Sequence, residues 1–131
     1  MKLARKQQGS IQLVFRKREI QLLEIILCAG RNTDPVIRNT TDEEVDALHR
    51  KISSVLEQVT GDTVEFSLAL DELIKASLII EAVNTMDANS SYPELRGRFP
   101  SDNELEEFTR NIGEVYDQIF PLKYMFPGWT T

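Results

Sequence analysis

Residues 41–59 read TDEEVDALHRKISSVLEQV, and residues 101–119, sixty positions later, read SDNELEEFTRNIGEVYDQI. Six of the nineteen aligned positions are identical and five more are conservative, whereas average composition gives roughly one identity by chance. Each segment opens with a hydroxyl residue that is followed three positions later by Glu, which is the capping box that starts a helix. An apolar stripe at helical spacing follows in both segments, so we predict two equivalent amphipathic helices.

Each of these predicted helices is preceded by a strand and by another helix. Residues 10–16 alternate apolar and polar side chains, and residues 64–70 do the same, which is the pattern of a half-buried strand. Dense apolar segments follow at residues 19–29 and 71–83, and their length favours buried helices. The upstream segments align at an offset of 51 residues, so the order strand, helix, helix occurs twice.

We therefore predict an α+β fold of internally duplicated β-α-α units. Two strands are expected to pair antiparallel, with four helices packed on one face and a pseudo-twofold relation between the units. A single domain is expected over residues 10–131, with repeat 1 at about 10–60, repeat 2 at about 62–120 and an aromatic tail at 120–131. Two independent units of about sixty residues would each be marginally stable, so the halves are expected to share one core. Residues 1–9 are expected to form a flexible basic arm.

The charge of the chain is unevenly distributed. The net charge of 131 residues is −6, but residues 1–18 hold six basic and no acidic side chains, which leaves −12 on the remainder. This split indicates a basic edge on an acidic body. The chain has no apolar stretch of about 20 residues, as a bilayer span requires, and no apolar signal core at its start. We expect a cytoplasmic protein without membrane contact.

Few residues in the chain suggest catalysis or metal binding. There is no phosphate-binding glycine loop, no paired-cysteine metal site and no nucleophile elbow. Cys28 lies in an apolar run at 25–29, where a buried, inert thiol is expected, and His49 is expected to be solvated or partly packed. A nucleophilic pair would require these two residues to meet. We therefore predict no catalytic residue, no metal site and no cofactor, and a protein that is not an enzyme.

Candidate binding residues lie where the two copies differ. The second copy has nine extra residues in its loop at 84–100, and the chain ends in a tail at 120–131. Both segments carry aromatic or arginine side chains, which are enriched at protein interfaces; the candidates are Tyr92, Arg96, Arg98, Phe99, Tyr124, Phe126 and Trp129. The alternative is that the loop is a solvated connector and the tail covers the core. We predict a regulatory or adaptor domain that binds another protein and forms a homodimer through its strand edges.

The basic start of the chain provides an alternative function. A nucleic-acid-associated accessory factor would contact phosphates through five side chains, which are Arg5, Lys6, Arg16, Lys17 and Arg18. The acidic body disfavours this alternative because it repels a polyanion. A third possibility, that the acidic helices imitate nucleic acid and inhibit a nucleic-acid-binding partner, is weaker because solvated helix faces commonly have this composition.

Overall fold

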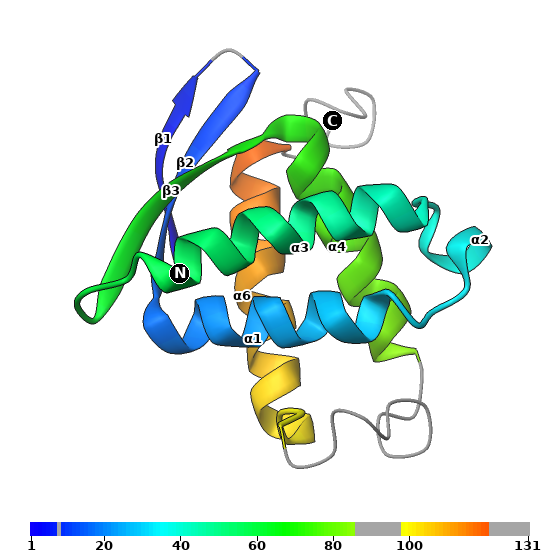
Figure 1. Ribbon diagram of the computed structural model, residues 1–131. Coiled ribbons are helices and arrows are strands. Elements are labelled where there is room, and N and C mark those ends of the chain that lie inside the picture. The colour runs from blue at the N-terminus through cyan, green and yellow to red at the C-terminus, as the bar shows by residue number, and fades with distance from the viewer. Residues whose placement is uncertain (8, 86–97, 121–131) are drawn as a thin grey trace, which may run out of the picture.

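The computed structural model describes residues 1–7, 9–85 and 98–120. Within these ranges the chain has three strands and five helices, with a single antiparallel sheet (Figure 1). The strands are β1 (Lys2–Gln7), β2 (Ser10–Arg16) and β3 (Thr63–Ala69), and the helices are α1 (Lys17–Gly30), α2 (Pro35–Arg38), α3 (Asp42–Glu57), α4 (Leu70–Asn84) and α6 (Asp102–Ile119). The predicted α+β class is confirmed.

The sheet has β2 at its centre, with β1 on one side and β3 on the other. Side chains along β2 alternate between buried and half-buried, as the sequence pattern predicts. In the register with β3, Leu13 faces Phe66 and Ile11 faces Leu68, so the buried side chains of both strands lie on one face. Phe15 and Phe66 meet edge to face, with ring centroids 5.1 Å apart. This apolar face forms one wall of the core.

The prediction of two strands and a flexible arm is wrong, because residues 2–7 of that arm form the third strand. β1 pairs antiparallel with β2, and Gln7 pairs with Ser10. Gly9 has a φ of 78°, in the left-handed region that tight hairpin connections need and that glycine adopts without strain. The arm has few apolar side chains because β1 is an edge strand with a mostly exposed surface. Its pairing depends on backbone hydrogen bonds, which sequence periodicity does not report.

Both inner strands run directly into helices. The carboxylate of Glu19 accepts a hydrogen bond of 2.8 Å from the Arg16 amide at the start of α1, and Glu72 accepts one of 2.8 Å from the Ala69 amide at the start of α4. These amides would otherwise be unpaired donors at a helix N-terminus. Arg16 and Ala69 are 53 positions apart. This spacing is two residues longer than the offset of 51 at which the upstream sequence segments align.

The two predicted capping boxes form to different extents. At α3 the box is complete, because the Thr41 hydroxyl accepts from the Glu44 amide at 3.1 Å and Glu44 accepts from the Thr41 amide at 2.9 Å. At α6 the Ser101 hydroxyl accepts from the amide of Glu104 at 3.2 Å, but the Glu104 carboxylate is bound by Arg18. The second box is therefore half formed, because a cation from α1 takes the carboxylate that would complete it.

Helix α1 contacts both α3 and α4, and α6 contacts α4 and β1 (Figure 1). At Gly30, the last residue of α1, the backbone packs closely against α4, because a Cβ added there would overlap the Cγ2 atom of Ile79. The apolar stripes of α3 and α6 contribute Val45, Leu48, Ile52, Phe108, Ile112, Val115 and Ile119 to the buried core. Among the described helices, none is both long and apolar enough to span a bilayer.

Candidate functional site

A buried arginine organises the connection between α1 and α3. The Arg38 side chain is 0% exposed. Its guanidinium donates to the carbonyls of Gly30 at 2.8 Å and Thr33 at 2.7 Å and to the Thr40 hydroxyl at 3.0 Å, and it forms an ion pair with Asp42. Five N–H donors in a planar fork allow one arginine to bind so many acceptors. The guanidinium therefore ties both ends of the connection together.

Local turn chemistry shapes the rest of this connection. The Asp34 carboxylate accepts from the Val36 amide at 2.9 Å, and Pro35 occupies the first position of α2, which is the usual arrangement at a helix start. Asn39 closes α2 in the left-handed conformation with a φ of 53°, which asparagine tolerates better than most residues. We call residues 31–41, with this internal hydrogen bonding, the α2 loop.

The α2 loop holds two apolar side chains out toward solvent. Val36 is 85% exposed and Ile37 is 65% exposed, and in Figure 1 α2 lies on the opposite side of the helices from the sheet. Residues 31–46 carry five acidic and two basic side chains, a net charge of −3. The exposed pair is thus an apolar point on a loop whose own contacts fix its conformation, and the acid-rich start of α3 follows this loop in the sequence.

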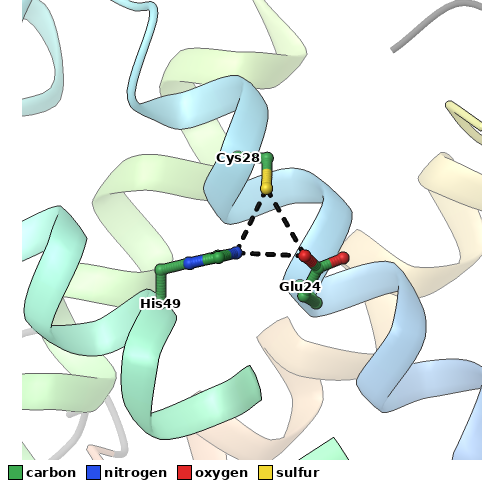
Figure 2. Close-up of side chains that lie close together, drawn as sticks. All are labelled: Glu24, Cys28 and His49. Carbon is green, nitrogen blue, oxygen red and sulfur yellow. Dashed lines mark hydrogen bonds and ion pairs between the residues drawn. The ribbon is translucent and has the colours of Figure 1, made fainter.

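Next to the α2 loop, three ionisable side chains converge (Figure 2). Glu24 and Cys28 lie one turn apart on α1, and His49 reaches them from α3. The His49 Nε2 atom is 3.1 Å from the Cys28 Sγ and 3.0 Å from the Glu24 Oε1, and these two atoms are 3.5 Å apart. We call these residues the Glu-Cys-His cluster. The expectation of a buried thiol is wrong, because Cys28 is half-buried, whereas the half-buried His49 fits the expectation of a partly packed imidazole. The contact between these two side chains was not predicted.

The electrostatics of the cluster differ from those of a nucleophilic pair. Burial, reinforced by the charge of Glu24, raises the pKa of the Cys28 thiol to about 11, whereas reactive cysteines have a lowered pKa. Glu24 also contacts the same ring nitrogen as the thiol, whereas the carboxylate of a catalytic triad orients the ring through the opposite nitrogen. Sulfur, imidazole nitrogen and carboxylate oxygen are, however, the three ligand types that zinc prefers.

A cavity of about 380 Å³ opens beside the cluster and extends to the base of the α2 loop. Cys28 and His49 line it together with Arg31, Asp46 and Arg98. Arg31 is held by ion pairs to two acids of α3, at 3.0 Å to Asp42 and 2.9 Å to Asp46. These ion pairs join the base of the α2 loop to α3 at the wall of the cavity.

Only some of the predicted partner-binding residues can be placed. Arg98 donates to the Glu24 Oε2 atom at 3.2 Å, and Phe99 packs half-buried against the core. Both therefore have structural contacts. The other five candidates lie outside the described residues; they are Tyr92, Arg96, Tyr124, Phe126 and Trp129.

The predicted nucleic-acid-binding residues are spread over several elements. Lys6 on β1 donates to the carbonyl of Ile119 at 3.2 Å. Ile119 is the last residue of α6, and the negative end of the helix dipole stabilises a cation there. Arg18 forms two hydrogen bonds to Glu104, of 2.9 and 2.7 Å, which hold the pKa of that carboxyl below its ordinary value.

The remaining three basic candidates, Arg5, Arg16 and Lys17, are exposed. Arg16 lies 3.6 Å from the Glu19 carboxylate. Lys6, Arg16 and Arg18 thus have intramolecular partners, which weakens the case for a dedicated phosphate-binding surface.

The sequence did carry signals for the residues that were missed. Asp34-Pro35 is a helix-start pair, and it directly precedes the exposed Val36 and Ile37. Glu24 and Cys28 have the four-residue spacing that places two side chains on the same helix face. Comparisons with protein families, with characterised proteins and with solved structures find no match for this chain.

Proposed function

We propose that this chain is a non-enzymatic regulatory or adaptor domain that binds another protein through Val36 and Ile37. The observation that carries the proposal is the contrast within α2: two apolar side chains are 85% and 65% exposed, while Arg38 beside them is fully buried. A buried charge is costly unless its hydrogen bonds are satisfied, and here they hold the loop that exposes the apolar pair.

Preorganisation makes this small apolar surface effective. A partner that binds a flexible loop must overcome the entropy of ordering it, and a fixed loop avoids that cost. Full burial of a valine or isoleucine side chain contributes about 1.5–3 kcal/mol. Two such side chains can therefore anchor a contact of moderate affinity.

The charge around the loop indicates the chemistry of the partner. With a net charge of −3 over residues 31–46, the surface favours a partner that presents an apolar pocket bordered by basic side chains. The same charge disfavours nucleic acid, so that alternative requires the exposed basic residues near the start of the chain. A flat binding response to DNA and RNA at low salt is the expected result.

The test compares affinity capture from cells of the source organism with three forms of the full chain. One is unmodified, one carries Val36→Ser and Ile37→Ser, and the control carries Ile74→Ser. Ile74 on α4 is the matched control because it is also a large exposed apolar residue, at 38% exposure. Neither change alters the buried core, so the folds are expected to remain intact.

The expected result is at least one protein that the unmodified chain and the Ile74→Ser variant retain and the double variant loses. Equal capture by all three forms contradicts the proposal, because the bound proteins then do not depend on α2. An apolar pocket with basic residues in the retained protein is also expected.

Three finer features of the organisation are proposed as well. We propose that β2-α1-α3 and β3-α4-α6 are duplicated units related by a pseudo-twofold axis, and that the protein acts in the cytoplasm. A homodimer is proposed because β1 and β3 are the outer strands of the described sheet, and unpaired outer edges can bind a second copy. Sedimentation at increasing concentration tests the dimer, and a monomer throughout contradicts it.

A further inference from the structure

The structure brings together one sulfur, one nitrogen and one oxygen ligand atom, and we propose that the Glu-Cys-His cluster binds a zinc ion. In the described part of the chain it is the one group of three or more His, Cys, Asp or Glu residues whose ligand atoms lie within 4.8 Å of one another. The two ligands on α1 share a helix face, and the third comes from α3, so the ion would join the two helices.

The separations of the three ligand atoms are slightly shorter than those around a tetrahedral zinc ion. Zinc lies about 2.3 Å from sulfur and about 2.0–2.2 Å from nitrogen or oxygen, which places neighbouring ligand atoms about 3.3–3.6 Å apart. The three separations in the structure are 3.0, 3.1 and 3.5 Å. Binding therefore requires the side chains to spread by about half an ångström at most, which rotamer adjustment can supply.

The second oxygen of Glu24 already has a partner. Arg98 donates to the Glu24 Oε2 atom at 3.2 Å, which leaves the Oε1 atom directed at Cys28 and His49 (Figure 2). Hydrogen bonds of this kind orient the ligands of zinc sites and tune their affinity. Arg98 is thus a positioning residue for a carboxylate that binds through one oxygen.

The fourth coordination position would face the cavity of about 380 Å³ that Cys28 and His49 line. Three protein ligands with one open position distinguish accessible zinc sites from closed structural ones. The open position would hold water or a donor atom from a bound molecule. This inference is independent of Val36 and Ile37.

Cobalt and zinc titrations of the full chain, purified without a histidine tag and kept reduced with a phosphine, test the site. The chain has a single cysteine and a single histidine, so a thiolate-to-cobalt absorption band can arise only from Cys28. One equivalent of Co²⁺ is expected to produce the band, and Zn²⁺ is expected to abolish it. Failure of Co²⁺ to produce the band in the unmodified chain overturns the proposal, whatever the variants do.

Variants then identify the ligands by zinc calorimetry. Cys28→Ser and His49→Gln are expected to abolish one-to-one binding, and Arg98→Ala is expected to weaken it about tenfold, as loss of a positioning hydrogen bond does. Asp46→Asn is the matched control, because Asp46 lines the same cavity but binds Arg31. Equal zinc affinity in the unmodified chain and the Cys28→Ser variant would place the ion on surface carboxylates and overturn the proposal.

Discussion

Replacing Arg38 by methionine is the most informative perturbation of the α2 loop. Methionine keeps an unbranched side chain and so limits the empty space left by the arginine, but it lacks all the hydrogen-bond donors of the guanidinium. The Gly30 carbonyl would still accept from Thr33, through the hydroxyl at 2.7 Å and the amide at 3.0 Å, and Asp42 would keep its ion pair with Arg31 at 3.0 Å.

The loss of stability can be worked out from the acceptors that remain. The Thr33 carbonyl loses the 2.7 Å bond from Arg38, and an orphaned buried acceptor costs about 1–3 kcal/mol. Loss of the charged bonds to Gly30, Thr40 and Asp42 adds roughly 1.5–3 kcal/mol. The sum is about 2.5–6 kcal/mol. The corresponding fall in melting temperature is roughly 10–25 °C for a domain of this size.

The assay is urea unfolding followed by circular dichroism, with Arg110→Met on the exposed face of α6 as the matched control. The control is expected to unfold as the unmodified chain does. Arg38→Lys keeps the charge without the planar fork of donors, so its stability should lie between those of the unmodified chain and the Arg38→Met variant. A loss below about 1 kcal/mol for Arg38→Met would refute the reasoning that the guanidinium holds the loop in place.

Three further predictions concern stability. Gly30→Ala places a Cβ against Ile79 and should lower the unfolding free energy by about 1–3 kcal/mol; the added change Ile79→Ala should then cost less than it does in the unmodified background, and additive losses in the double-mutant cycle would contradict the contact. Thr41→Ala should cost about 1 kcal/mol and more than Ser101→Ala, because the box at α3 is complete; equal losses in thermal unfolding would contradict this difference. The hydrogen bond from Lys75 and the backbone amide of Thr41 lower the pKa of Glu44 from 4.5 to about 2, so its stabilisation is present above about pH 4.5 and is lost as the pH falls toward 2. Glu44→Gln should flatten the pH dependence of unfolding in that range, and an unchanged slope would contradict it.

Local signals in the sequence predicted most of the helices and the inner strands. Capping at Thr41 and Ser101 and the alternation in β2 depend on residues close together in the chain, and the structure bears them out. β1 was missed because its partner strand, rather than its own side chains, stabilises it. The strand contains a single large apolar residue, Leu3, so it shows no recognisable alternation of apolar and polar side chains.

The candidate site was harder to predict because it depends on packing. Arg38 was not expected in the interior, since arginine is almost never fully buried unless it is paired, and its acceptors are mostly backbone carbonyls that no motif encodes. The meeting of Cys28 with His49 depends on how α1 packs against α3. The four-residue spacing of Glu24 and Cys28 could have suggested a shared face, but not the third member on another helix.

The most direct test of the proposed protein contact is photo-cross-linking at α2. A photoreactive phenylalanine analogue placed at Ile37 in the full chain, and at Ile74 as the control, would be activated in cells of the source organism. We predict a discrete cross-linked product with another protein from position 37 and none of the same mass from position 74. Identical products from both positions, or no product from position 37, would contradict the assignment of α2 as the binding surface.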